Sequence, residues 1–372
     1  MKFLKNKRYL LLINSVFLVL ILYSKNYLTA LKLSWFFILV TALLISYLIT
    51  PLVRIIATKM GAMDIPDERK IHKNPVPRLG GLAIYTALII SITLNFHFSL
   101  ALKGVVIGGS IIFIMGVIDD IKGLKASIRL IGQLIAVMIL IKYGVILNTF
   151  PHTNMGHIGN ILLTIFWIIG IINALNFLDG MDGLAAGITV ISSFMFFIIA
   201  LSTGQYYLSY LAIALIGACT GFLFYNFKPA SIFLGDSGST LLGFLLASFA
   251  VMGWWAEKNI LVALGIPVLI LSVLIFDMIY ITVSRIASGK VKNFREWIEY
   301  TGQDHLHHRL SNLGLSEKQT VLMIYLISFI LGITTLVLRN ANKLNACLLL
   351  LQAVLIFALI AILMKLGKKK AS

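Results

Sequence analysis

Apolar runs long enough to cross a lipid bilayer recur along the 372-residue chain and limit its fold more than any other feature. A membrane-spanning helix needs about 20 predominantly apolar residues. With 59% hydrophobic and 12% charged residues, the chain is too apolar for an ordinary water-soluble globule. We expect an all-α, polytopic bundle of about 12 transmembrane helices forming one integral membrane domain, residues 1–372. The expected spans are 9–23, 35–57, 81–98, 104–118, 127–147, 159–178, 184–201, 206–225, 238–256, 260–284, 319–338 and 346–364.

The basic residues predict how these helices are oriented. Lys and Arg collect in alternate connections, and all but seven of the 31 lie on the side that holds the N-terminus. Because cytoplasmic loops are enriched in these residues, we expect a multi-pass protein of the cell inner or plasma membrane with both termini cytoplasmic. The first span resembles a signal peptide but has a poor cleavage site, so we expect it to be retained. The net charge of +17 then follows from topology and indicates no nucleic-acid partner.

The acidic residues indicate where chemistry takes place. Of the fourteen, only Glu257 falls in an expected outside connection and only Asp277 lies well within a span. A nucleotide-sugar or ion-coupled transporter, the alternative hypothesis, would place ionisable groups along a pathway near the membrane midplane. Acids gathered at one rim favour a site where a water-soluble substrate meets a lipid-embedded one. A lipid-binding scaffold without activity would tolerate loss of these acids.

The loop "PDERKIHKNPVPRLGG", residues 66–81, combines Lys70 and Arg78 with a double glycine at an expected helix start. Free backbone N–H groups beside a cation suit a phosphate. An ordinary basic inside loop with turn-forming residues would show the same pattern. We therefore treat Lys70 and Arg78 as candidates for phosphate neutralisation.

Adjacent carboxylates at Asp119 and Asp120 end one span. They repel each other unless a cation or a shared proton relieves them, although such a pair can also mark the membrane edge. Asp236 begins a later span within "GDSGST". This segment is a plausible helix cap, but Mg²⁺ also takes one or two carboxylates together with phosphate oxygens.

The segment "NALNFLDGMDGLAAG" repeats a polar side chain every three residues, at Asn173, Asn176, Asp179 and Asp182. A corner broken by glycines would gather the later members on one side. Asn, Asp and Gly are ordinary turn formers, so a plain polar loop is the simpler interpretation. This connection has no Lys or Arg, however, which favours a divalent cation or substrate hydroxyl groups as partners of the carboxylates.

Three of the seven histidines fall within "DHLHHRL", at His305, His307 and His308, followed by Arg309. The cluster lacks the cysteine or carboxylate companions of a closed zinc site. Contacts with a diphosphate are therefore the favoured interpretation.

Taken together, these motifs resemble the polyprenyl-phosphate N-acetylhexosamine-1-phosphate transferase superfamily, glycosyltransferase family 4, from about Pro66 to Gly314. "DHLHHRL" is closer to the undecaprenyl-phosphate GlcNAc-1-phosphate transferase branch than to the peptidoglycan branch. The resemblance implies a ten-helix catalytic core, residues 35–338, with an extra helix at each end. These additions are residues 1–34 and residues 339–372, the latter with a basic tail.

The resemblance also implies a reaction. The phosphate of a polyprenyl phosphate, such as undecaprenyl phosphate, attacks the β-phosphorus of a UDP-HexNAc, most simply UDP-GlcNAc, and UMP leaves. Mg²⁺, or alternatively Mn²⁺, would shield the diphosphate. This would be the first membrane step of a cell-envelope glycan pathway, with lipopolysaccharide and teichoic acid both open, as is a homodimer.

Carried over motif by motif, the resemblance assigns three sets of residues. The metal would be held by Asp236 and Asp182. The substrates would be bound by Lys70, Arg78, Asn173, Asn176 and Arg309. The catalytic set would be Asp119, Asp120, Asp179, Asp182, His305, His307 and His308.

Overall fold

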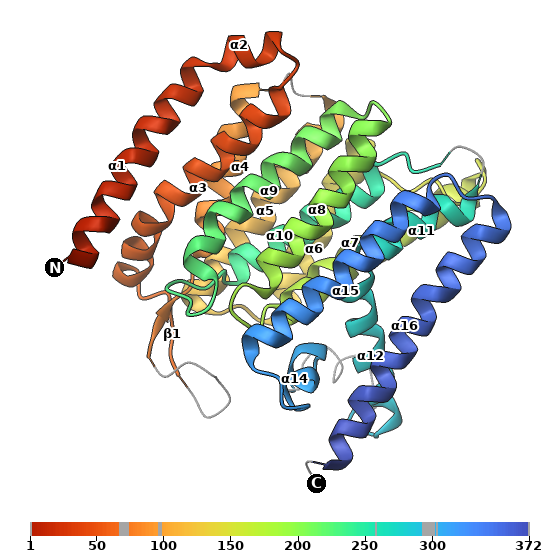
Figure 1. Ribbon diagram of the computed structural model, residues 1–372. Helices are drawn as coiled ribbons and strands as arrows, with labels where there is room; N and C mark the ends of the chain where they lie inside the picture. The colour runs from red at the N-terminus through yellow and green to blue at the C-terminus, as the bar shows by residue number, and fades with distance from the viewer. Residues whose placement is uncertain are drawn as a thin grey trace.

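Helices form on all of the predicted apolar segments in the computed structural model, which describes residues 2–66, 74–95, 99–256, 259–291, 302 and 304–370 (Figure 1). Two short antiparallel strands, β1 (Met63–Asp64) and β2 (Val76–Pro77), join α3 to α4. The helices are α1 (Lys2–Tyr23), α2 (Lys25–Ala30), α3 (Ser34–Lys59), α4 (Gly80–Asn95), α5 (Leu100–Lys122), α6 (Ala126–Lys142), α7 (Asn154–Leu178), α8 (Leu184–Ser202), α9 (Tyr206–Asn226), α10 (Asp236–Met252), α11 (Ile260–Ile270), α12 (Ser272–Ala287), α14 (Leu306–Ser311), α15 (Glu317–Leu338) and α16 (Lys343–Lys370).

Seven of these helices are long and apolar enough to cross a membrane, and the bent pair α11–α12 would make eight. Three further apolar segments, Leu10–Tyr23, α4 and α10, are helical but shorter than a full span. The chain is therefore a multi-pass helical membrane protein. The total of twelve spans and the cytoplasmic position of the loops stay predictions.

The expected span 260–284 is wrong as one straight helix, because the chain bends by 81° between α11 and α12. Pro267 precedes the bend by one turn and removes a backbone donor from α11. At the bend, the carbonyl of Ile270 accepts a hydrogen bond from Ser192 Oγ at 3.2 Å. A side chain of α8 thus satisfies a backbone group at the break, where the helical ladder is interrupted.

Two other expected spans are too long at their C-terminal ends. The helix predicted over 127–147 ends at Lys142, and Gly144 then takes a left-handed conformation with φ of 84°. The residues that follow Gly144 lie against α7, where Asn160 Oδ1 accepts hydrogen bonds from the amides of Thr149 and Phe150, both at 2.9 Å. The helix predicted to reach residue 256 ends at Met252.

The helix α10 lies at the centre of the bundle, packed against α5, α7 and α4. Small residues let its first turn approach its neighbours closely. A Cβ atom on Gly81 of α4 would overlap the backbone of Gly238, and one on Gly116 of α5 would overlap that of Ser237. These contacts bring the start of α10 against the start of α4 and the end of α5.

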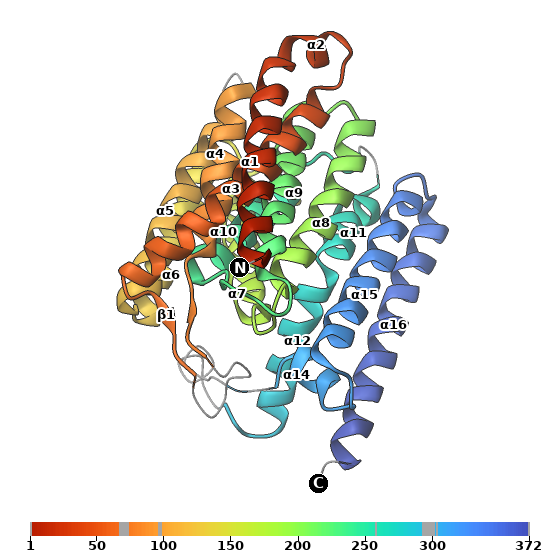
Figure 2. The ribbon, with the colours of Figure 1, turned by 60° about the vertical axis from the view of Figure 1, so that its left-hand side comes forward.

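Polar parts of the chain gather at one end of the bundle. The β1–β2 hairpin, α14, the first turn of α1 and the last turn of α16 all lie at this end, whereas α2 lies at the opposite end (Figures 1 and 2). We call the end that holds the hairpin and α14 the polar end.

Candidate active site

A cavity of about 600 Å³ opens at the polar end, between the start of α10 and the ends of α5 and α7. Its walls bring together residues of five motifs that are far apart in sequence. The predicted site residues that line it are Arg78, Asp120, Asn176, Asp179, Asp182, Asp236 and His308. Lys70 lies outside the described residues.

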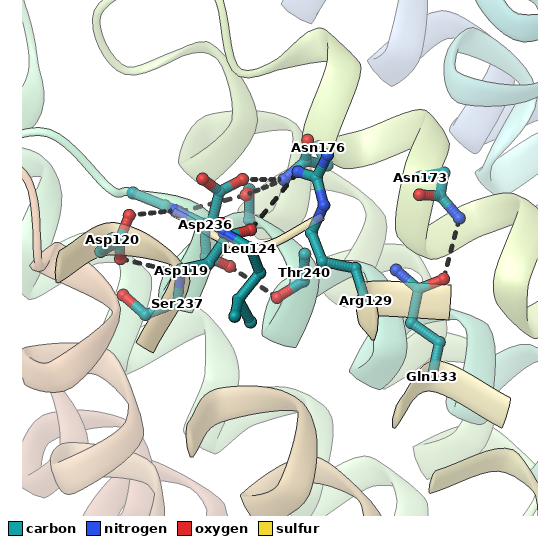
Figure 3. A network of polar contacts seen from close by, with 12 residues as sticks. Asp119, Asp120, Leu124, Arg129, Gln133, Asn173, Asn176, Asp236, Ser237 and Thr240 are labelled. Atoms are coloured by element: carbon teal, nitrogen blue, oxygen red, sulfur yellow. Dashed lines mark hydrogen bonds and ion pairs between the residues drawn. The ribbon is translucent and has the colours of Figure 1, made fainter. Parts of the chain in front are cut away.

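Asp120 holds the first turn of α10 in place. Its two carboxylate oxygens accept the backbone amides of Asp236 and Ser237 at 2.8 and 3.0 Å, and its side chain is almost fully buried (Figure 3). A carboxylate at a helix N-terminus satisfies amides that have no partner within the helix. Asp120 therefore joins α5 to α10 and fixes where Asp236 lies.

Asn176 makes the corresponding link from α7 to α10. Its Nδ2 donates to Asp236 Oδ1 at 2.7 Å and to Ser239 Oγ at 2.9 Å (Figure 3). The amide orients the Asp236 carboxylate at the cavity wall. A direct hydrogen bond thus joins two motifs that are 60 residues apart in sequence.

Asp179 and Asp182 lie in the turn between α7 and α8. Burial, together with the charges of Asp236, Asp120 and Asp182, raises the pKa of Asp179 to about 8. Asp182 Oδ2 accepts the amide of Ala230 at 2.9 Å, which ties this turn to the loop before α10. The glycine-broken corner expected here is present, since Gly183 has a φ of 80°.

Arg78 lies beside the same carboxylates but contacts backbone. Its guanidinium donates to the carbonyl of Asp120 through Nε at 3.3 Å and Nη2 at 3.1 Å. The expectation of free amides at Gly80 and Gly81 is wrong, because they donate to the carbonyls of Phe233 and Leu234, both at 2.9 Å. The double glycine instead permits the close contact between α4 and α10.

Two predicted residues from the same motifs are not among those lining the cavity. Asp119 accepts the amide of Leu124 at 2.6 Å and lies 3.4 Å from Arg129 Nη1, so it stabilises the turn from α5 to α6. Asn173 donates to Gln133 Oε1 at 3.1 Å, one helical turn away from Asn176 (Figure 3). Their proposed roles in catalysis and substrate binding stay predictions.

The short helix α14 carries the histidines and is held by α12. Asp277, almost fully buried, accepts His305 Nδ1 at 2.9 Å and the amide of Leu306 at 2.7 Å. This carboxylate within an apolar span therefore fixes the N-terminus of α14. Both of its carboxylate oxygens are engaged in holding α14.

The other two imidazoles differ in exposure, since His308 lines the cavity and His307 is almost fully buried. His307 packs against Gly180, and neither of its ring nitrogens has a partner among the described residues. Burial and the neighbouring imidazoles hold the pKa of His307 well below its usual value. His308 lines the cavity, and burial followed by the charge of His305 lowers its pKa as well. Both shifts favour the neutral form of the rings.

Arg309 turns away from the cavity toward α12. Its Nε donates to the carbonyl of Asp304 at 2.6 Å, and its guanidinium lies 5.0 Å from the ring centroid of Tyr280. Arg285 makes a two-point ion pair with Asp304, at 2.7 and 2.9 Å. Although burial acts to raise it, the pKa of Asp304 is lowered by this guanidinium. Both arginines therefore position α14, and substrate binding by Arg309 stays a prediction.

Sequence reasoning missed several residues that line the cavity, namely Asp64, Asn74, Asn226, Lys228 and Glu317. Lys228 lies in the predicted cytoplasmic loop that precedes Asp236. Its place in the same loop as a candidate metal ligand is the sequence signal that could have identified it. Glu317 begins α15, directly after Ser316, which forms a capping box with Gln319. Asp64 and Asn74 belong to the hairpin, whose pairing brings them to the cavity.

The donor set suits a hard divalent cation. Asp120, Asp179, Asp182 and Asp236 are all carboxylates of one cavity, and burial followed by the charges of the other three raises the pKa of Asp179. Among the described residues, no three acids, histidines or cysteines enclose an ion unaided. Mg²⁺ needs only one or two carboxylates when substrate phosphates and water complete its shell, so these residues fit it.

Comparison with known proteins agrees with this chemistry. The family model described as glycosyl transferase family 4 matches residues 102–254. A probable undecaprenyl-phosphate N-acetylglucosaminyl 1-phosphate transferase of Bacillus subtilis is 34% identical, over 82% of this chain and 84% of the relative. A decaprenyl-phosphate N-acetylglucosaminephosphotransferase of Mycolicibacterium smegmatis is 34% identical, over 77% of each chain.

A phospho-N-acetylmuramoyl-pentapeptide-transferase of Desulforamulus reducens is also similar, with 32% identity over 60% of this chain and 66% of the relative. The likeness to the N-acetylglucosaminyl enzymes thus extends over more of the chain, as the histidine motif indicated. With this extent of identity, and with the polar motifs assembled around one cavity, the chain belongs to glycosyl transferase family 4.

Proposed function

We propose that the protein transfers GlcNAc-1-phosphate from UDP-GlcNAc to a polyprenyl phosphate and releases UMP. The observation that carries this proposal is the gathering of Asp120, Asn176, Asp179, Asp182 and Asp236 around one open cavity at the polar end. The relatives named above support both the sugar phosphate and the lipid carrier. The transporter hypothesis finds no such support among them.

The chemistry is a phosphoryl-group transfer. A phosphate oxygen of the lipid attacks the β-phosphorus of UDP-GlcNAc, and a new P–O bond forms. The bond from this phosphorus to the bridging oxygen breaks, and UMP leaves with the electron pair. Such reactions depend mainly on positioning and on neutralising charge.

In this scheme five of the side chains that line the cavity have assigned tasks. Asp236 and Asp182 would hold Mg²⁺, or alternatively Mn²⁺, with Asn176 orienting Asp236. A bound divalent ion would supply charge neutralisation for the diphosphate and for the departing UMP. Asp120 would act by fixing the start of α10, since both of its oxygens are used there.

His308 would contact the substrate phosphates as a neutral imidazole, because its pKa is lowered. One ring nitrogen of a neutral imidazole donates a hydrogen bond and the other accepts one. His308 can therefore donate to a phosphate oxygen without adding charge.

We further propose that the polar end faces the cytoplasm of a bacterial inner or plasma membrane, so that both termini are cytoplasmic. UDP-GlcNAc would then enter the cavity from water while the lipid phosphate approaches from the bilayer. The product would enter assembly of a cell-envelope glycan.

The test is UMP release by purified protein with Mg²⁺, polyprenyl phosphate and UDP-GlcNAc. We expect release by the wild type, and none by Asp236→Asn at unchanged thermal stability. Parallel assays with UDP-GalNAc and a deoxy-aminosugar nucleotide define the sugar. Wild-type activity in Asp236→Asn would remove the metal assignment, and lack of UMP release with every UDP-HexNAc would remove the proposed function.

A further inference from the structure

Lys228 and Glu317 form an ion pair on the wall of the cavity. Lys228 belongs to the loop between α9 and α10, and Glu317 lies in the first turn of α15. Their side chains are 33% and 19% exposed, so both can be reached by a solute that enters the cavity. Neither the motifs nor the proposed catalytic set includes this pair.

In the part of the chain that the structure describes, carboxylates outnumber cationic side chains on the wall of the cavity, and Lys228 is one of the few cations there. Arg78 and Lys228 are the two cationic side chains among the described residues that line it, against six carboxylates. Arg78 is already fixed on the carbonyl of Asp120. Lys228 has a different kind of partner, a side chain that itself lines the cavity, and its four-carbon stem lets the ammonium move between partners.

Contacts other than this ion pair hold α15 and the loop that carries Lys228 against the turn between α7 and α8. Tyr325 of α15 donates from its hydroxyl to the carbonyl of Gly183 at 2.5 Å. The loop that carries Lys228 is tied to the same turn by the hydrogen bond from the amide of Ala230 to Asp182. Because partly exposed ion pairs contribute little to stability, breaking the link between Lys228 and Glu317 should leave the fold unchanged.

We propose that Lys228 binds a phosphate group of the substrate, and that Glu317 holds the ammonium in the free protein and competes with that phosphate. The inference rests on the proposed function, which brings phosphates into this cavity. A phosphate oxyanion is a stronger acceptor for the ammonium than a single partly exposed carboxylate. Glu317 would thus set how tightly the phosphate is bound.

This arrangement predicts opposite effects for the two partners. Lys228→Met should raise KM for the phosphate substrate about tenfold, since it removes a hydrogen bond between charged groups. Glu317→Gln should lower that KM about two- to fivefold, since the ammonium no longer has to leave a partly exposed ion pair. The double variant should behave like Lys228→Met, and Lys228→Arg should retain most of the affinity.

Lys318→Met is the matched control, because Lys318 neighbours Glu317 and is exposed but is not among the residues lining the cavity. It should leave KM unchanged. Thermal stability in detergent is measured for every variant, and we expect all of them to match the wild type. A plain structural link would instead lower stability in both single variants and move KM in the same direction.

Two series of KM measurements identify the phosphate, one varying UDP-GlcNAc and one varying polyprenyl phosphate. A change confined to the first assigns Lys228 to the nucleotide diphosphate, and a change confined to the second assigns it to the lipid phosphate. Equilibrium binding of UDP with Mg²⁺ gives a readout besides turnover. If the wild type releases UMP but Lys228→Met and Glu317→Gln leave both KM values unchanged, this inference fails while the proposed function stands.

Discussion

Replacing Asp179 with Asn should change how the stability of the protein depends on pH. In the folded protein the pKa of Asp179 is raised from 3.8 to about 8 by burial and by the charges of Asp236, Asp120 and Asp182. The folded state therefore binds this proton more tightly than the unfolded state. Consequently the free energy of unfolding falls as the pH rises from about 4 to about 8.

The size of the effect follows from the shift. With a pKa of about 8 in the folded state and 3.8 in the unfolded state, raising the pH from 6 to 8.5 lowers the free energy of unfolding by about 2.5 kcal/mol. Because Asp179 is partly exposed, solvent screening reduces this to about 1–2 kcal/mol. For a chain of 372 residues, with about 2.1 cal/mol/K of unfolding entropy per residue, the melting temperature falls by about 1–3 °C.

The assay is thermal unfolding in detergent, followed by intrinsic fluorescence, with a chelator present. The melting temperature of the wild type should decline from pH 6 to pH 8.5, and that of Asp179→Asn should decline less. Adding Mg²⁺ should reduce the difference, since a nearby cation favours the ionised carboxylate. Asp304→Asn is the control, because the pKa of Asp304 is lowered and that group stays ionised across this range. Parallel declines in the wild type and Asp179→Asn would refute the reasoning.

Two further substitutions test the supports of the site. Asp277→Asn should reduce UMP release by roughly 10- to 100-fold, because His305 and Leu306 lose a buried charged acceptor; faster hydrogen exchange confined to α14 should accompany the loss. Gly81→Ala should lower the melting temperature by several degrees, because the added methyl group overlaps the backbone of α10, whereas Gly170→Ala, with open space around it, should be neutral or slightly stabilising. Equal melting temperatures for these two variants would contradict the proposed close contact.

Hydropathy predicted where the helices form, because a long apolar run has few alternatives to a membrane helix. It could not predict the bend between α11 and α12, since Pro267 is also tolerated within continuous helices. The count of charges on alternate loops predicted that Asp120, Asp179, Asp182 and Asp236 lie on one side of the membrane, and all four line the cavity.

What this reasoning could not provide is the direction in which each side chain points. Asp119 and Asp120 are adjacent, yet one stabilises a turn and the other caps a helix, which depends on which amides lie opposite. Arg309 follows His308 directly but points toward Tyr280, because α14 presents successive residues to different sides. Such differences arise from packing between distant segments rather than from local pattern.

The hydrogen bonds of Asp120 have a consequence for how the protein meets its ligands. Both of its oxygens accept amides of the first turn of α10, so the geometry of that wall is determined during folding. A cation and two phosphates would enter a scaffold already arranged for them, with little reorganisation on arrival. Removing the ion with a chelator would then abolish activity without unfolding the protein. Adding the ion back would restore activity at once, with no lag for refolding.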